Sequence, residues 1–289
     1  MIQFLINCLA TSALNLLAGI AVSLVYLPTG CFPIHLGFVA LAGAYTAWRA
    51  QPQLGLPLAL AASALAAAAT GLVSELAVLG PIRRSSIQPG MSLIASLAIF
   101  TIGIHTISMF AGDDVKSFTA QTRLPFSIGS ANYLTLPQFA TTLSSSLLFM
   151  ALICALRYTA SGRKLLAVSY QPQLARIYGL RPERIRAAAV MIGSAISGLT
   201  AAFISWDTGL EPGLGFSLVV AGAVTMIVSG IGEPHWLLGG AILLGFLNNI
   251  AAVLLGAKWI QAVSLAIMIL FLLLRPLGMS GRRLRKIAV

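Results

Sequence analysis

The sequence contains 289 residues, of which 58% are hydrophobic and only 9% are charged, and its mean hydropathy is +0.93. A soluble domain could not cover its surface with so few polar side chains, so this composition excludes a soluble globular protein. We therefore expect an all-α polytopic membrane protein in which residues 1–289 form a single transmembrane domain.

Apolar stretches follow one another along the whole chain, each near the roughly 20 residues that one membrane-spanning helix requires. They predict about 8–10 transmembrane helices. The N-terminus lacks a positively charged region, so the first stretch is interpreted as a span rather than a removed signal. The stretches cover residues 5–27, 33–50, 56–79, 91–111, 137–156, 187–206, 216–232, 236–256 and 259–275.

Positive charges predict the orientation of the chain. The formal net charge is +11, and basic side chains gather at Arg83 and Arg84, in the loop 158–186 and in the tail 276–289. Because Lys- and Arg-rich loops stay in the cytoplasm, we expect a membrane protein with its N-terminus outside, an outer loop at 112–136 and a cytoplasmic C-terminus. Short basic loops without a DNA-reading motif do not indicate nucleic-acid binding.

A short helix is predicted inside the basic loop, at Leu174–Leu180. Gly179 suits its C-terminal cap, and Pro182 suits the first turn of the next helix. A short helix with an apolar face, held at the membrane surface between two spans, is a docking element. Its spacing places three apolar side chains on one face: Leu174, Ile177 and Tyr178.

An internal repeat links the two halves of the chain. Residues 29–44 read TGCFPIHLGFVALAGA, and residues 208–223 read TGLEPGLGFSLVVAGA. The predicted orientation starts the first copy at the inner face and the second at the outer face, which indicates an inverted-topology repeat. The alternative is that Gly and other small residues recur in any membrane helix. Paired segments of this kind line transport routes, which makes five residues pathway candidates: Thr29, Phe32, His35, Thr208 and Glu211.

Few ionisable side chains lie within the apolar stretches. Glu75 and His105 could together relay a proton, because ionisable groups inside a membrane are candidates for function. The interpretation we favour pairs Glu75 with Arg83 or Arg84 near the inner face, and gives His105 a neighbouring backbone partner.

Other polar residues indicate packing rather than chemistry. Asn248 and Asn249 favour hydrogen bonds between helices over contacts with a solute, and Gly239-Gly240 suits close helix approach. The sequence shows no Ser/His/Asp set, carboxylate pair or metal-ligand cluster. We therefore expect no catalysis, no bound metal and no cofactor.

Together these features resemble the membrane-spanning permeases of branched-chain amino-acid ABC importers, the Liv type, over nearly the whole chain. The order and spacing of several stretches carry this resemblance more than any single stretch. They are Gly30–Tyr45, Glu75–Arg83, Tyr158–Arg163, Ala175–Gly179, Glu211–Phe216, Gly230–Gly232 and Leu238–Gly245.

The resemblance implies a fold like that of the type II ABC importer permeases and an assembly embedded in the lipid of the bacterial inner (plasma) membrane. Its other members would be a second Liv-type permease, identical or related, two cytoplasmic ATPase subunits and a periplasmic substrate-binding protein. The chain has no Gly-x4-Gly-Lys-Ser/Thr phosphate loop, so ATP hydrolysis is expected on the separate subunits.

The predicted short helix is similar to the coupling helix of this family. The resemblance implies that its Ala175-x3-Gly179 face sits in a cleft of the ATPase and transmits closure to the spans. The residues so implicated are Leu174, Ala175, Ile177, Tyr178, Gly179 and Leu180.

Several positions depart from the family pattern. The family typically has Asn-Phe-Ala-His-Gly after the first span, where this chain has Pro33-Ile-His-Leu-Gly37. Gly80 replaces the usual Arg before Pro, and Tyr170 and Gln171 stand where acidic residues are common. These changes leave the branched-chain substrate open, because other Liv-type systems import urea, short amides or other small amino acids.

The sequence thus predicts the permease subunit of an ATP-driven importer for a small polar solute, an amino acid before other classes. A self-sufficient secondary transporter is the alternative from another class, since it would also show inverted repeats. Such a transporter usually needs an ion or proton site at mid-membrane, whereas a surface helix between basic spans suits an ATPase partner. A membrane enzyme has little support.

Overall fold

The computed structural model describes residues 2–84, 89–118, 126–127, 133–232, 234–275 and 278–279. These residues form a bundle of helices, with one short antiparallel hairpin of β1 (Phe126–Ser127) and β2 (Tyr133–Leu134) at one end. The longer helices are α1 (Ile2–Thr29), α2 (Leu36–Ser74), α4 (Pro89–Ala111), α5 (Leu136–Tyr158), α8 (Pro182–Thr208), α9 (Leu214–Ser229), α10 (Leu237–Leu254) and α11 (Ile260–Leu274). The shorter elements are the π-helix η1 (Glu75–Leu79), α3 (Gly80–Arg84), α6 (Ala160–Tyr170), α7 (Pro172–Ile177), and the 3-10 helices η3 (Pro234–Trp236) and η4 (Ala257–Trp259).

The predicted polytopic helical fold is confirmed. Within the described residues, six helical runs are long and apolar enough to cross a membrane, and α9 and α11 are shorter apolar helices. At 1.5 Å per residue, the 16 residues of α9 extend about 24 Å, less than the roughly 30 Å of hydrocarbon in a bilayer. The stretch predicted at 216–232 therefore does not span a membrane as an α-helix alone.

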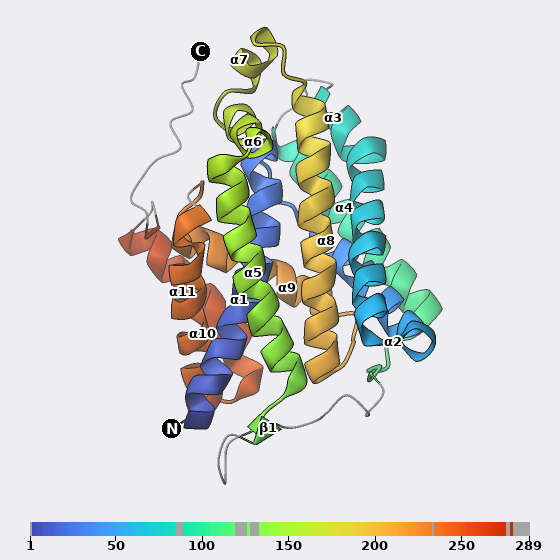
Figure 1. The fold of residues 1–289 in the computed structure, drawn as a ribbon, viewed down its shortest axis with the longest axis vertical. Helices are drawn as coiled ribbons and strands as arrows, with labels where there is room; N and C mark the ends of the chain where they lie inside the picture. The colour runs from blue at the N-terminus through green and yellow to red at the C-terminus, as the bar shows by residue number, and fades with distance from the viewer. Residues whose placement is uncertain are drawn as a thin grey trace.

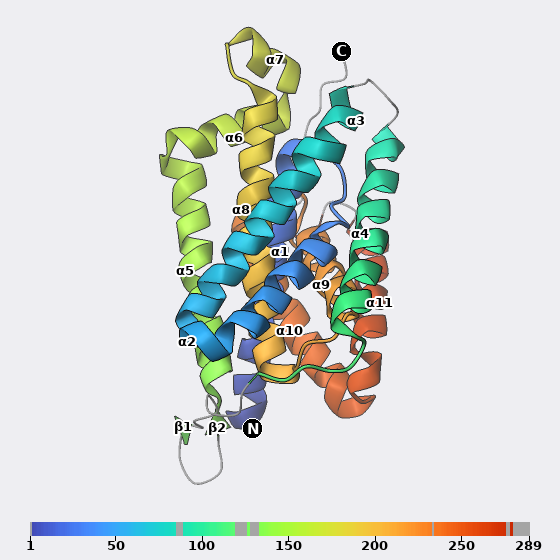
Figure 2. The same ribbon diagram turned by 90° about the vertical axis from the view of Figure 1, so that its right-hand side faces the viewer.

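Helix α2 contains most of two predicted stretches, 33–50 and 56–79, as two arms of one bent element, and η1 forms the end of the second stretch. Gly55 has φ 74° and ψ 169°, which breaks the helix, and Pro52 and Pro57 flank it. Proline removes a backbone donor and crowds the preceding turn, so the bend lies where the sequence is least able to stay helical. Figure 2 shows the two arms of α2 meeting at this bend.

Helices α1 and α8 are largely buried and form the centre of the bundle, whereas α4 and α5 are mostly exposed at its periphery. The two central helices run in opposite directions (Figure 1). Small residues allow the close contact between them, since a Cβ on Gly193 of α8 would lie 3.0 Å from the carbonyl oxygen of Ala21 in α1.

The two copies of the repeat meet at equivalent glycines. Gly37 and Gly215 occupy the Leu-Gly-Phe motif at the start of α2 and of α9. A Cβ added to Gly37 would lie 2.7 Å from the Gly215 carbonyl oxygen, and a Cβ added to Gly215 would lie 2.5 Å from the Gly37 carbonyl oxygen. The two backbones are therefore in direct contact, and only glycine fits at either position.

A second pair of equivalent glycines shows that each half of the repeat packs against the other half. A Cβ on Gly43 of α2 would lie 2.9 Å from the Gly198 Cα of α8, and a Cβ on Gly222 of α9 would lie 2.6 Å from the Ala18 carbonyl oxygen of α1. The second helix of each half thus packs on the first helix of the other half. With α1 and α8 antiparallel, this reciprocal packing is that of an inverted-topology repeat.

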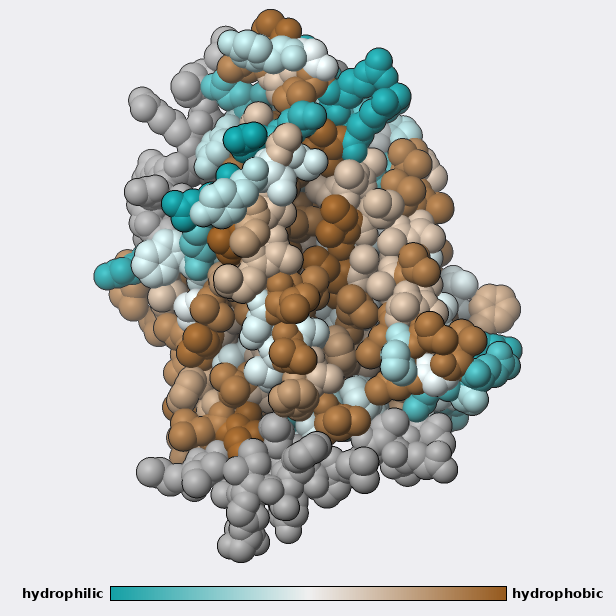
Figure 3. Space-filling view, viewed as in Figure 1, coloured by the Kyte–Doolittle hydropathy of each residue, from teal (hydrophilic) through white to brown (hydrophobic). Residues whose placement is uncertain are grey.

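Charged side chains divide between the two ends of the bundle. Basic residues gather at the end that carries α3, α6 and α7. Figure 3 shows this end as hydrophilic, with an apolar surface below it on the face drawn. We call this end the basic end; the predicted tail 276–289 lies outside the described residues apart from 278–279. Its described basic residues are Arg83, Arg84, Arg157, Arg163, Lys164, Arg176, Arg181, Arg184 and Arg186.

Candidate functional site

The basic loop 158–186 folds into α6 and α7, and α7 projects beyond the bundle (Figures 1 and 2). The helix predicted at Leu174–Leu180 is observed at Pro172–Ile177. It begins earlier because Pro172 occupies its first turn, where the missing backbone N–H is not needed. Pro182 occupies the first turn of α8, as predicted.

The predicted helix end was wrong because Tyr178, Gly179 and Leu180 form the cap rather than the last turn. The Gly179 N–H donates to the Arg176 carbonyl at 2.9 Å, and the Leu180 N–H donates to the Ala175 carbonyl at 3.0 Å. This is a Schellman motif, which requires a left-handed residue after the helix. Gly179 provides it with φ 78°, so its predicted capping role is confirmed.

The outward face of α7 is apolar. Ile177 and Tyr178 are 81% and 79% exposed, and Leu174 is 46% exposed. Ala175 is only 4% exposed, because it packs inside the chain beneath the cap. The Ala175-x3-Gly179 face is thus half internal, and the side chains available to a partner are the larger apolar ones.

Polar contacts connect α7 to the two central helices. Arg176 forms an ion pair with Glu183 in the first turn of α8, at 2.5 Å between Nη2 and Oε1. Three residues further along α8, the Arg186 Nε donates to the Pro28 carbonyl oxygen near the end of α1, at 3.0 Å. Arg176 thus links α7 to α8, and Arg186 links α8 to α1.

The pathway candidates divide into two groups at opposite ends of the bundle. Thr29, Phe32 and His35 line one small pocket near the basic end, with a volume of about 10 Å³. Thr208 is exposed as the last residue of α8 at the other end of the bundle, and Glu211 is exposed just beyond it. The structure does not bring the five residues together, and the pocket beside the first three holds at most about one water.

His35 contributes to packing in this structure. It is 2% exposed, and both its backbone nitrogen and its Nδ1 lie within 3.1 Å of the Ser96 hydroxyl on α4. These contacts join the chain before α2 to α4, across the same region where Gly37 meets Gly215.

Glu75 forms an ion pair with Arg83, which confirms the interpretation favoured by the sequence. The carboxylate is buried at the start of η1, and His105 is exposed on α4. The Gly80 N–H donates to the Glu75 carbonyl, and a Cβ on Gly80 would lie 2.7 Å from that oxygen. The glycine found in place of the usual arginine thus fits the π-helical turn.

Asn248 and Asn249 connect helices, as the sequence indicated. The Asn249 Nδ2 on α10 donates to the Thr11 hydroxyl on α1 at 3.0 Å, and Asn248 accepts a hydrogen bond from Ser264 on α11 at 2.8 Å.

Gly240 allows a close contact between α10 and Ser229 at the end of α9, whereas Gly239 faces no such neighbour.

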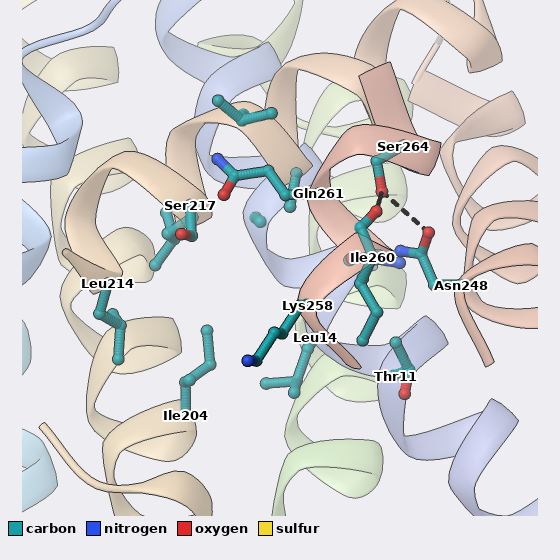
Figure 4. A pocket seen from close by; sticks show the side chains of 15 residues that line it. Thr11, Leu14, Ile204, Leu214, Ser217, Asn248, Lys258, Ile260, Gln261 and Ser264 are labelled. Carbon is teal, nitrogen blue, oxygen red and sulfur yellow. Dashed lines mark hydrogen bonds between the residues drawn. The ribbon is translucent and has the colours of Figure 1, made fainter. Parts of the chain in front are cut away.

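A pocket with both polar and apolar walls, which the sequence did not predict, lies among α1, α8, α9, α10 and α11 (Figure 4). Its volume is about 360 Å³, and Lys258 of η4 is the one charged residue among the described residues that line it. A lone lysine between the apolar stretches 236–256 and 259–275 was the available signal. Its polar walls are Thr11, Asn15, Ser217, Asn248, Lys258, Gln261 and Ser264.

Within the described residues, no group of three or more His, Cys, Asp or Glu side chains could hold a metal ion. The geometry therefore offers an exposed apolar helix at the basic end, a central pair of helices connected to it, and a pocket with one lysine toward the opposite end.

Known proteins are similar over most of this chain. High-affinity branched-chain amino acid transport system permease protein BraD of Pseudomonas aeruginosa is 27% identical, covering 97% of this chain and 96% of BraD. LivH of Escherichia coli K12, named in the same way, is 25% identical over 75% of this chain and 71% of its own length. A probable branched-chain amino acid transport permease protein LivH of Methanocaldococcus jannaschii is 24% identical, covering 93% of this chain and 89% of its own length.

A solved structure supports the fold. PsaBC from Streptococcus pneumoniae, in complex with Fab, matches with a TM-score of 0.54 at 13% sequence identity, over 98% of this chain and 95% of that chain. Residues 4–272 match the family described as branched-chain amino acid transport system / permease component. The chain belongs to this family of transport permeases.

Proposed function

We propose that residues 1–289 form one transmembrane domain, the permease subunit of an ATP-binding-cassette importer that moves a small amino acid into the cytoplasm. The observation that carries this proposal is the apolar outer face of α7, exposed at the basic end and connected to α8 and α1. An ATPase subunit that binds α7 would move both central helices through the Arg176–Glu183 and Arg186–Pro28 contacts.

The partners proposed are those that the permease family implies. The chain contains no phosphate loop of its own, and two cytoplasmic ATPase subunits would supply the energy. A second permease, identical or related, would complete the membrane part and cover part of its exposed apolar surface. A periplasmic binding protein would deliver the solute.

The orientation is proposed from charge. The basic end belongs in the cytoplasm of a bacterial cell, because basic loops are retained on that side. The N-terminus and the outer loop 112–136 would then lie outside and the C-terminus inside. Cysteines introduced in the loop 158–186 should be labelled only from the cytoplasmic side, and labelling from outside would contradict this topology.

The solute class comes from the named relatives, which carry branched-chain amino acids in their names. Pro33 and His35 depart from the pattern common in the family, and Liv-type permeases for urea or short amides keep the same architecture. A branched-chain amino acid is therefore the first solute to test, and urea is the second.

A secondary transporter is the alternative from another class. It would need an ionisable group free to carry charge across the membrane. Glu75 is the buried carboxylate closest to that description among the described residues, and its ion pair with Arg83 supports a structural role instead.

Co-purification tests the partners directly. The tagged permease, expressed with the ATPase and permease genes of its own cluster and extracted in mild detergent, should retain ATPase subunits and hydrolyse ATP. A tagged permease that purifies without any ATPase, yet still catalyses solute uptake in vesicles, would contradict the proposal.

A further inference from the structure

The pocket of Figure 4 lies toward the end of the bundle opposite α7. Asn249 near the C-terminus of α10 contacts Asn7 and Thr11 in the first turns of α1, so this part of α10 lies beside the start of the chain. Lys258 follows in the connection between α10 and α11. A solute that arrives on the N-terminal side of the bundle would meet this pocket where α1 and α8 face α9, α10 and α11.

Hydrogen-bond donors without partners line this pocket. Asn15 is 6% exposed on α1, and its Nδ2 has no hydrogen-bond partner among the described residues. A buried amide without a partner is rare, because leaving it unpaired costs free energy. The Lys258 side chain reaches into the pocket toward Ile204 and Leu214, and its ammonium group is in no ion pair in the described part of the chain (Figure 4).

The arrangement suits an anion. The described residues that line the pocket include no Asp or Glu, so nothing there neutralises Lys258. Gln261, whose side chain points toward Ser217, supplies a further amide (Figure 4). The acceptor of Asn248 is already occupied by the Ser264 hydroxyl.

The rest of the wall is apolar. It is formed by eight aliphatic side chains from α1, α8, α9 and α11: Leu14, Ala18, Ile204, Leu214, Leu218, Val220, Ala221 and Ile260. A pocket of about 360 Å³ lies in the size range of small-molecule sites, in which a few polar groups orient a ligand against apolar walls.

We propose that this pocket binds the carboxylate of a small solute with an apolar side chain, through Lys258 and the Asn15 amide. The inference rests on the proposed function, because it places the first membrane contact of the imported amino acid there. The aliphatic wall accepts the side chain, and the carboxylate satisfies the unpaired amide and the lysine.

Protection of a single cysteine tests the site without requiring transport. In a full-length chain whose Cys8, Cys31 and Cys154 are replaced by serine, Ser217→Cys places a thiol on the exposed rim of the pocket. L-leucine at about three times its dissociation constant should slow alkylation of this thiol about fourfold, by occupancy. L-leucinol, which lacks the carboxylate, should protect far less.

Variants of Lys258 identify the recognising group. Lys258→Gln should raise the leucine concentration needed for protection by about tenfold or more, since hydrogen bonds to charged groups are the stronger ones. Lys258→Arg should keep most of the protection. Ser161→Cys, an exposed serine on α6 at the other end, should be alkylated at the same rate with and without leucine.

Three outcomes would overturn the site: equal protection by leucine and leucinol, no protection by either, or protection unchanged in Lys258→Gln. The assay repeated in nanodiscs with and without phosphatidylglycerol separates a lipid headgroup from a solute. Slow alkylation without leucine that depends on that lipid would also overturn the proposal. Uptake that fails while leucine protection persists would count against the importer function and leave the binding site standing.

Discussion

Ile177→Glu is expected to reduce ATP-driven uptake to background while the permease still accumulates in the membrane. Ile177 is 81% exposed on a helix that projects beyond the bundle, so a charge there costs the fold little. In a contact with an ATPase, the same carboxylate would be buried against an apolar surface without a partner, which costs several kcal/mol, roughly the effect of losing an interface hot spot. Uptake and co-purified ATPase should be measured in the same preparation.

Two exposed tyrosines provide a second test and a control for this experiment. Tyr178→Glu, at the cap of α7, should behave as Ile177→Glu does, because Tyr178 is 79% exposed on the same face. Tyr158→Glu, at the end of α5 in the same basic region, removes a tyrosine that is 72% exposed and should leave ATPase association intact. Normal uptake in both α7 variants would refute the docking role.

Gly37→Ala and Gly215→Ala are each expected to destabilise the protein by roughly 1–3 kcal/mol, the cost typical of overpacking. A Cβ at either position would lie within 2.7 Å of the carbonyl oxygen of the other glycine, and backbone atoms cannot rotate away as a side chain can. The backbone contact between α2 and α9 at these two glycines would have to open. The thermal midpoint of the detergent-solubilised permease is the measurement.

Gly90→Ala is the control for these variants. Gly90 is exposed in the first turn of α4, and a Cβ there would meet no atom within 4 Å. Because alanine favours helix over glycine by up to about 1 kcal/mol, this change should leave the midpoint unchanged or raise it. Equal thermal midpoints for all three variants would show that the contact between α2 and α9 does not depend on glycine.

Composition and spacing predicted most of the fold. Each apolar stretch coincides with a helix or an arm of a helix, because a membrane leaves the chain few other ways to satisfy its backbone. The bend at Gly55 could also have been predicted, since Pro52 and Pro57 flank it. The reciprocal packing of the repeat could not, because sequence similarity does not tell which helices touch.

The site was predicted less completely. Helical spacing correctly placed Gly179 at a cap, but it could not show that Ala175 packs inside its own chain rather than against a partner. The pocket around Lys258 is formed by residues from five helices far apart in the sequence. A local pattern cannot reveal a set of that kind.

The energy source for uptake is the most direct test of the claim that this chain works in an ATP-driven importer. The complete assembly, reconstituted in proteoliposomes with ATP held constant, should import radiolabelled leucine at a largely unchanged rate when a protonophore dissipates the gradient. A gradient does about 2.3 kcal/mol of work per elementary charge per 100 mV, but only through a charge that moves, and Glu75 is held by Arg83. Inactivating the phosphate loop of the partner ATPase should abolish uptake. Uptake that collapses with the protonophore at constant ATP, and survives loss of that phosphate loop, would contradict the account.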